Sequence, residues 1–173
     1  TVFVLFSKPV SRAAFIAGKF LGLALTMAVV MAGMGLFLFA VVWVIDGAPT
    51  WLVLAAVALV YVQLLVIVAV TIFLSTLGSA ILASVLGICI FIAGQLSTNV
   101  LSLTRLGENA VTEVLSWVVF VLIPNFPAVD VKPAVVGEQA ADWGSVALWC
   151  VYLAAYVAAV LLLATAVFRR KEF

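Results

Sequence analysis

Polar side chains that could bind or guide a substrate are rare within the apolar stretches of this 173-residue chain. Gln63 lies near the middle of one long apolar stretch. Gln95 and Asn99 lie near the end of the next stretch, together with Ser97 and Thr98. An amide surrounded by apolar groups needs a hydrogen-bonding partner. These residues therefore indicate a translocation path or a contact between protomers, or else hydrogen bonds that hold neighbouring helices together, and both interpretations stand at this point.

The chain lacks most of the reactive groups that membrane enzymes use. It has no histidine, which argues against haem ligation and most catalytic zinc sites, and it has no Ser–His pair. Gly18 and Lys19 are not followed by Ser or Thr, so they do not form a phosphate-binding loop for ATP. Cys89 and Cys150 lie in apolar stretches, as small buried side chains do. We therefore expect no catalytic residue, no metal, no cofactor and no enzymatic activity.

The elements that carry these residues are four apolar runs without a single charged side chain. As helices, each reaches roughly 35 Å or more, which is enough to cross a hydrocarbon core of about 30 Å. The chain is 68% hydrophobic and 9% charged, whereas soluble domains carry about a quarter charged residues. The sequence predicts an all-α, polytopic helical membrane protein, with residues 1–173 as one transmembrane domain. Its four transmembrane helices are expected at residues 20–45, 51–73, 80–103 and 145–168.

The distribution of charge predicts how these helices are oriented. Residues 1–19 and the tail, 169–173, are both basic, whereas the connecting stretch 104–144 is acidic. Lys and Arg favour the cytoplasmic side of a membrane. Both ends of the chain are therefore expected in the cytoplasm, with the protein in the inner (plasma) membrane. Four crossings satisfy this arrangement, and three or five do not.

The stretch 104–144 is expected to be an outer loop with a short apolar helix at residues 114–123. Ten residues span about 15 Å as a helix, which is half a bilayer. Pro124 and Pro127 stop this helix sharply. We expect it to dip into the membrane and return, or to lie at the interface. Because the chain opens on Thr1 rather than Met, its natural start is expected further upstream.

Short motifs along the chain resemble a known family of transporters. L-F-S-K-P-V-S-R-x-x-F-I-x-G-K-F-L-G at 5–22 resembles the cytoplasmic segment of exporter-type ABC-transporter permeases. F-L-S-T-L-G-S at 73–79, L-I-P-N-F-P at 122–127 and V-F-R-R-K-E-F at 167–173 are similar to later parts of that family, in the same order. The resemblance implies that this chain corresponds to the C-terminal two-thirds of a six-span subunit.

The resemblance also implies a function and partners. Such a permease pairs with a second copy or a homologue, and separate ATP-binding-cassette ATPase subunits hydrolyse the ATP that moves an unidentified substrate, outward in the exporter sense of the family. Pro9 fixes a bend between two cations in the turn expected to contact the ATPase. That turn comprises Ser7, Lys8, Pro9, Val10, Ser11 and Arg12. The alternative is a non-catalytic membrane scaffold or assembly subunit of a larger complex. Membrane lipid is an expected partner, and nucleic acid is not, because the net charge is only +1.

Overall fold

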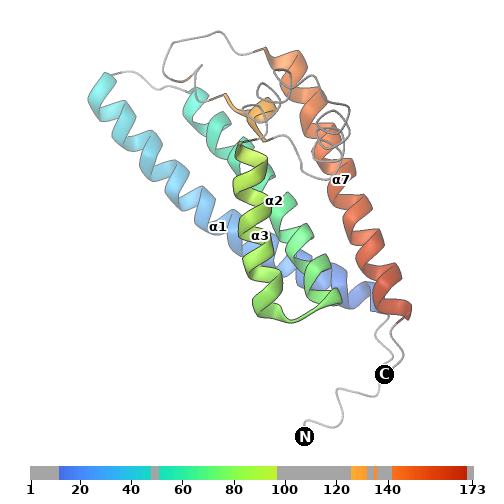
Figure 1. Cartoon of the computed structure of the whole chain (residues 1–173). Helices are drawn as coiled ribbons and strands as arrows, with labels where there is room; N and C mark the ends of the chain where they lie inside the picture. Colours follow the sequence, from blue (N-terminus) through green and yellow to red (C-terminus); the bar gives the residue numbers. More distant parts are fainter. Residues whose placement is uncertain (1–11, 48–50, 97–125, 132–134, 136–141, 171–173) are drawn as a thin grey trace, which may run out of the picture.

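The computed structural model describes residues 12–47, 51–96, 126–131, 135 and 142–170, and this part of the chain is helical with no strand (Figure 1). The prediction of an all-α fold is confirmed for these residues. The elements are α1 (Arg12–Asp46), α2 (Trp51–Leu77), α3 (Ala80–Gln95), the short 3-10 helix η2 (Pro127–Val129) and α7 (Trp143–Arg170).

Three of these helices, not four, are long and apolar enough to cross a membrane. They are Ala13–Ile45, Trp51–Leu77 and Trp143–Phe168. The run expected to span at 80–103 forms α3, which is described over 16 residues. A helix of that length reaches about 24 Å and falls short of a hydrocarbon core of about 30 Å. Within the described residues, the prediction of four transmembrane helices is therefore corrected to three helices of sufficient length, and residues 97–103 lie outside this part.

Helix α2 is the central element, because α1, α3 and α7 all pack against it. Lipid tails are as apolar as the helices, so association depends on close packing and interhelical hydrogen bonds. Glycines permit two of these contacts. A Cβ on Gly87 of α3 would lie 2.6 Å from Oγ1 of Thr71, and a Cβ on Gly35 of α1 would lie 3.0 Å from Cγ1 of Val57. Both helices therefore approach α2 as closely as a glycine allows.

Local capping explains where the helices turn. Gly47 follows α1 with a φ of +69°, and its N–H donates to the carbonyl of Trp43 at 3.0 Å, as glycine commonly does after a helix. Between α2 and α3 the chain reverses within two residues, Gly78 and Ser79. The Ser79 hydroxyl accepts a hydrogen bond from the N–H of Leu82 at 3.3 Å and caps α3. The second transmembrane helix, expected at residues 51–73, continues to Leu77, so the turn is shorter than the gap between the two expected helices.

The start of α1 and the end of α7 lie side by side at one end of the bundle (Figure 1). The rings of Phe15 and Phe168 stack there with their centroids 6.2 Å apart. Next to them, Ile16, Ile72 and Ala164 form a buried cluster that joins α1, α2 and α7. The two described ends of the chain therefore share one face of the molecule.

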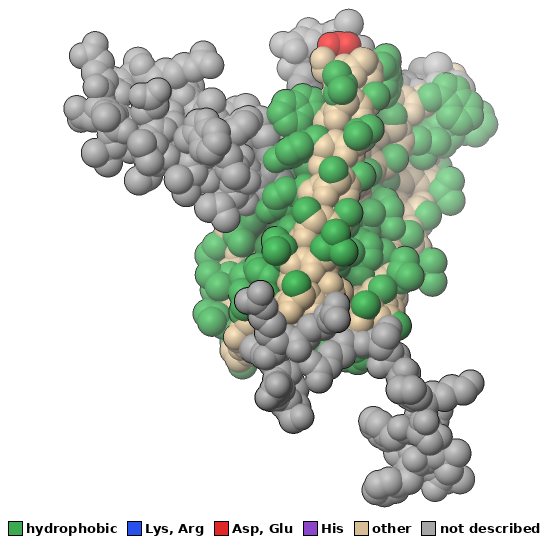
Figure 2. All heavy atoms as spheres, turned by 90° about the vertical axis from the view of Figure 1, so that its right-hand side faces the viewer, with side chains coloured by type: hydrophobic (Ala, Val, Ile, Leu, Met, Phe, Trp, Pro, Cys, Tyr) green, Lys and Arg blue, Asp and Glu red, His purple; other side chains and the backbone are tan. Residues whose placement is uncertain are grey.

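Much of the described surface is apolar, as expected for a protein embedded in lipid. Figure 2 shows a face of the bundle covered by hydrophobic side chains along the length of the helices. Long apolar side chains on α1, α3 and α7 are exposed, including Leu25, Ile81 and Leu148. Surfaces of this extent are typical of proteins whose surroundings are themselves apolar. The structure thus confirms the prediction of a membrane-embedded helical protein.

Candidate functional site

The candidate site is a pair of glutamine amides that hold a non-helical segment inside the bundle. Gln63 of α2 is only 4% exposed and is the buried polar side chain of the described core. Its Nε2 donates to the backbone carbonyl of Phe126 at 3.1 Å. Its Oε1 accepts a hydrogen bond from Nε2 of Gln95, in α3, at 3.3 Å. One amide therefore links α2 both to α3 and to the segment that carries η2.

The held segment, residues 126–131, contributes two of the largest fully buried side chains of the described core. Phe126 and Val129 are fully buried, and they form one cluster with Val66 of α2 and Leu153 of α7. The ring of Phe126 also lies against that of Phe91 in α3, with centroids 6.0 Å apart. The carbonyl of Phe126 accepts a second hydrogen bond, from the N–H of Val129 at 3.1 Å. The segment is thus fixed by three helices and by its own short turn.

The positions of its partners along the helices show how far the segment enters the bundle. Gln63 lies 12 residues after the first residue of α2, which corresponds to about 18 Å along the helix axis. Leu153 lies 10 residues after the first residue of α7, or about 15 Å. Both distances are about half of a hydrocarbon core of about 30 Å. Non-helical backbone is tolerated at such depth where protein surrounds it and its polar groups are bonded.

The chemistry that the described contacts show at this site is hydrogen bonding. Both functional ends of the Gln63 amide are engaged, and the side chains that surround the segment in its cluster are apolar or aromatic. Within the described ranges, no group of three or more His, Cys, Asp or Glu side chains is placed to hold a metal ion. The arrangement can fasten the segment to α2 and α3, with each bond contributing on the order of 1 kcal/mol.

The structure brings together two of the residues singled out in the sequence, Gln63 and Gln95. Asn99 lies outside the described residues, as does the apolar stretch 114–123. Of the turn expected to contact an ATPase, residues 7–11 also lie outside, and Arg12 is the first residue of α1. The sequence did not reveal that the partner of Gln63 is the carbonyl of Phe126. The nearest signal was the pair of prolines around this residue, which marks a break in the helix.

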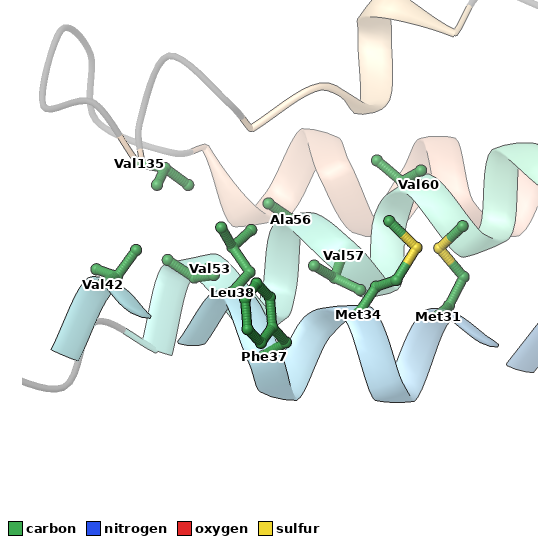
Figure 3. A pocket seen from close by; sticks show the side chains of 10 residues that line it. All are labelled: Met31, Met34, Phe37, Leu38, Val42, Val53, Ala56, Val57, Val60 and Val135. Atoms are coloured by element: carbon green, nitrogen blue, oxygen red, sulfur yellow. The ribbon is translucent and has the colours of Figure 1, made fainter. Parts of the chain in front are cut away.

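A second feature is an apolar hollow between α1 and α2, with a volume of about 610 Å³ (Figure 3). Two methionines and a phenylalanine of α1 face valines and an alanine of α2 across it, and Val135 lies over one side. A smaller hollow of about 240 Å³ also lies between the two helices, and Gly35 and Tyr61 are part of its wall. The larger hollow is lined by Met31, Met34, Phe37, Leu38, Val42, Val53, Ala56, Val57, Val60 and Val135.

Helices α1 and α2 touch along a narrow contact, and the two hollows lie on either side of it. That contact includes the approach of Gly35 to Val57. A hydrogen bond adds to it, because the hydroxyl of Tyr61 donates to the carbonyl of Ala24 at 3.1 Å. The lining of the larger hollow offers hydrocarbon and sulfur and no charged group. It therefore suits an apolar side chain or a lipid tail better than a polar solute.

Comparison with known proteins assigns the chain to a family without a known activity. The family model described as "Protein of unknown function (DUF2705)" matches residues 1–173. The chain belongs to this family. No curated protein and no solved structure matches the chain. Membership of the DUF2705 family does not supply a function.

The match to DUF2705 overturns the resemblance to exporter-type ABC-transporter permeases. The family that covers the whole chain is an uncharacterised one and not a permease family. The motifs indicated the wrong family for a physical reason. A turn at a membrane surface needs cations that reach the interface, a proline or glycine that bends the chain, and small hydroxyl residues that bond the backbone. S-K-P-V-S-R and S-T-L-G-S meet these needs, and unrelated membrane proteins meet them in the same way.

Proposed function

We propose that this chain is a non-catalytic, membrane-spanning subunit of a larger assembly and that α1 is its docking helix. The observation that carries this proposal is the exposure of α1. In the most apolar stretch of each long helix, 6% of the residues are buried in α1, against 11% in α7 and 28% in α2. Helix α1 thus packs against α2 and α7 along one side and presents most of its apolar surface outward.

The shape of this surface supports docking by another helix. Helix–helix association in lipid depends on packing rather than on removing apolar surface from water. A hollow of about 610 Å³ beside α1 offers a recess into which side chains of a neighbouring helix can insert. Phe37 projects from its edge and is 72% exposed. A second copy of the chain or a homologue is the partner that we propose for this surface.

We further propose that the chain crosses the membrane an even number of times, with its basic end in the cytoplasm of the inner membrane. Helix α1 begins and α7 ends at the same end of the bundle, whereas α7 begins at the opposite end (Figure 1). Between Leu77, which ends α2, and Trp143, which starts α7, the chain therefore passes from one end of the bundle to the other. Helix α3 runs in that direction. We propose that it forms part of a fourth crossing, in addition to those made by α1, α2 and α7. The bias of Lys and Arg toward the cytoplasm supports the orientation.

Photo-crosslinking in native membranes tests the docking proposal. A benzophenone amino acid replaces Phe37 of α1 in one variant and Leu148 of α7 in the matched control. Leu148 is exposed to a similar degree. We expect a discrete protein adduct from the position of Phe37 and chiefly lipid adducts from the position of Leu148. An adduct of twice the monomer mass identifies a second copy. The docking role of α1 is refuted if the Phe37 position yields lipid adducts alone.

A second candidate function is transport of a substrate, with ATP hydrolysed by a separate partner subunit. The observation that favours it is the non-helical segment 126–131 inside the bundle. Many transporters place interrupted helices and buried polar groups near the middle of the membrane. Liposomes that hold the purified assembly allow a direct test. ATP-dependent solute movement that is lost in Gln63→Leu and kept in Tyr61→Phe supports this function, and an assembly that neither hydrolyses ATP nor moves solute excludes it.

A further inference from the structure

Charged residues are separated between the two ends of the described bundle. The basic residues of the described helices all lie where α1 begins and α7 ends: Arg12, Lys19, Arg169 and Arg170. The described acidic residues are Asp46 at the end of α1, Asp130 directly after η2 and Asp142 directly before α7. Each of these lies toward the opposite end of the bundle. Among the described residues, the basic end therefore has no carboxylate of its own.

Packing between α1 and α7 brings cations from distant parts of the sequence to one rim. The stacked rings of Phe15 and Phe168 fix the two helices side by side at this end. Arg169 and Arg170 directly follow Phe168, and Arg12 lies one helical turn before Phe15. The places of these residues along the backbone are therefore set by a defined contact between two helices. We call Arg12, Lys19, Arg169 and Arg170 the basic rim.

Lys19 shows that the charge of this rim is available to a ligand. Its side chain is exposed, and its Nζ donates to the hydroxyl of Ser75 in α2 at 3.4 Å. An ammonium group has three N–H donors, and a neutral hydroxyl does not compensate its charge. The ammonium thus lies beside α2 with its positive charge intact and with donors to spare for an anionic oxygen.

Apolar surface directly adjoins the basic rim. Leu21 of α1 is 64% exposed, and Leu162 of α7 is 69% exposed. Both lie within three helical turns of the cations on the same helices. A ligand that fits this surface has an anionic head joined to long hydrocarbon chains. An acidic protein surface complements the charge but leaves the adjoining leucines without apolar contacts.

We propose that the basic rim is a binding surface for anionic phospholipids, with the phosphate at the cations and the acyl chains along α1 and α7. Each Lys or Arg near an anionic membrane surface strengthens such binding by a factor of about five. Charge complementarity and the adjoining apolar surface are independent of the role of α1 in docking. This inference therefore stands whether or not the proposed assembly exists.

Competition between two phospholipids tests the proposal on the full-length chain. The purified protein in mild detergent receives equal amounts of phosphatidylglycerol and phosphatidylcholine, and native mass spectrometry measures the ratio of the two bound lipids. We expect the wild type to bind phosphatidylglycerol preferentially. Raising the salt concentration should lower this preference because the charges are screened. Equal binding of both lipids by the wild type overturns the proposal.

Matched variants locate the preference on the rim. Arg169→Gln/Arg170→Gln should lower it by about fivefold or more. The control Arg105→Gln/Lys132→Gln removes the same amount of charge from the loop sequence and should leave it unchanged. Arg169→Lys/Arg170→Lys keeps the charge and should also retain the preference for phosphatidylglycerol. If this variant loses the preference, the cause is misfolding rather than loss of charge. If the rim variant and the loop control, each with two substitutions to Gln, lower the preference equally, net charge alone explains the effect and the rim is not a specific surface.

Two further measurements separate other anionic ligands from a lipid. Glycerol phosphate at the same concentration should not displace bound phosphatidylglycerol, because it lacks acyl chains. Displacement would mean that the rim binds a soluble phosphate and would overturn the lipid assignment. A poly-glutamate peptide that displaces the lipid from both the wild type and the control pair would assign the rim to an acidic protein partner instead.

Discussion

Nε2 of Gln63 donates a hydrogen bond to the carbonyl of Phe126 at 3.1 Å, across 63 residues of sequence. This bond joins the central helix α2 to a backbone segment that is not part of a membrane-spanning helix. Because α2 also contacts α1, α3 and α7, a change at this position reaches every described helix. The bond therefore ties this segment to the helix at the centre of the bundle.

Replacing Gln63 with Leu should destabilise the protein. The substitution removes two hydrogen bonds and leaves the amide of Gln95 without this partner in an apolar region. We expect a loss of about 1–3 kcal/mol in the free energy of unfolding, because unsatisfied buried polar groups are costly. Steric trapping or reversible unfolding in mixed micelles measures this value.

A double-mutant cycle with Gln95→Leu tests whether the two amides act as a pair. Gln95 is partly buried and makes one of the two bonds. The double variant should therefore cost less than the sum of the single variants, by roughly 0.5–1.5 kcal/mol. Tyr61→Phe is the matched control, since it removes one interhelical bond elsewhere. Additive costs for the two glutamines would contradict the pairing.

Gly87→Ala should push α3 away from α2. The added Cβ would lie 2.6 Å from Oγ1 of Thr71, a distance that real Cβ atoms do not tolerate. Overpacking of this kind costs typically about 1–3 kcal/mol. Adding Thr71→Ala should recover part of the loss because it removes the clashing atom. The melting temperature in detergent, followed by circular dichroism, measures both effects.

Gly18→Ala is the control for this substitution. No atom lies within 4 Å of a Cβ at Gly18, and alanine favours helix over glycine by up to about 1 kcal/mol. This variant should be as stable as the wild type or slightly more stable. If Gly18→Ala and Gly87→Ala lower the melting temperature equally, the effect of Gly87→Ala does not come from its contact with Thr71.

The features that could be predicted from the sequence are those with local causes. Long uncharged runs predicted helices in a membrane, and Gly47 and Ser79 lie where a turn and a cap were needed. The bond from Gln63 to Phe126 could not be predicted, because any carbonyl at the right depth can accept it and no residue type marks that carbonyl. The packing of α1 depends on a glycine meeting one particular valine. Short turn motifs suggested a family that the full-length match does not support.

Asp142 should stabilise the start of α7 at neutral pH. Its side chain accepts hydrogen bonds from the hydroxyl of Ser145 at 2.6 Å and from the N–H groups of Ser145 and Gly144. These bonds, chiefly the one from the Ser145 hydroxyl, hold the pKa of Asp142 below its ordinary value of 3.8. A lowered pKa in the folded state adds stability above the ordinary value, and this stability is lost as the pH falls through the folded-state pKa.

Two substitutions at this position separate charge from capping. Asp142→Ala removes the cap and should lower the melting temperature at neutral pH. Asp142→Asn keeps an acceptor without the charge, so it should lose less. The difference between the wild type and Asp142→Asn should shrink as the pH falls below about 4. A difference that is constant from neutral to strongly acidic pH would show that the carboxylate charge makes no contribution.

Side-specific labelling should show that the chain crosses the membrane between Gly78 and Trp143. Gly78 lies beyond α2, at the end of the bundle where α1 begins, and Trp143 starts α7 at the other end (Figure 1). Single cysteines replace these residues in a background with Cys89→Ala and Cys150→Ala. A membrane-impermeant maleimide should label the Trp143→Cys variant in intact cells and the Gly78→Cys variant only in inverted vesicles. Both residues are exposed, so poor access does not explain a negative result. If the reagent labels both cysteines from the same side, the chain makes no net crossing between them, and the topology with both described ends in the cytoplasm is wrong.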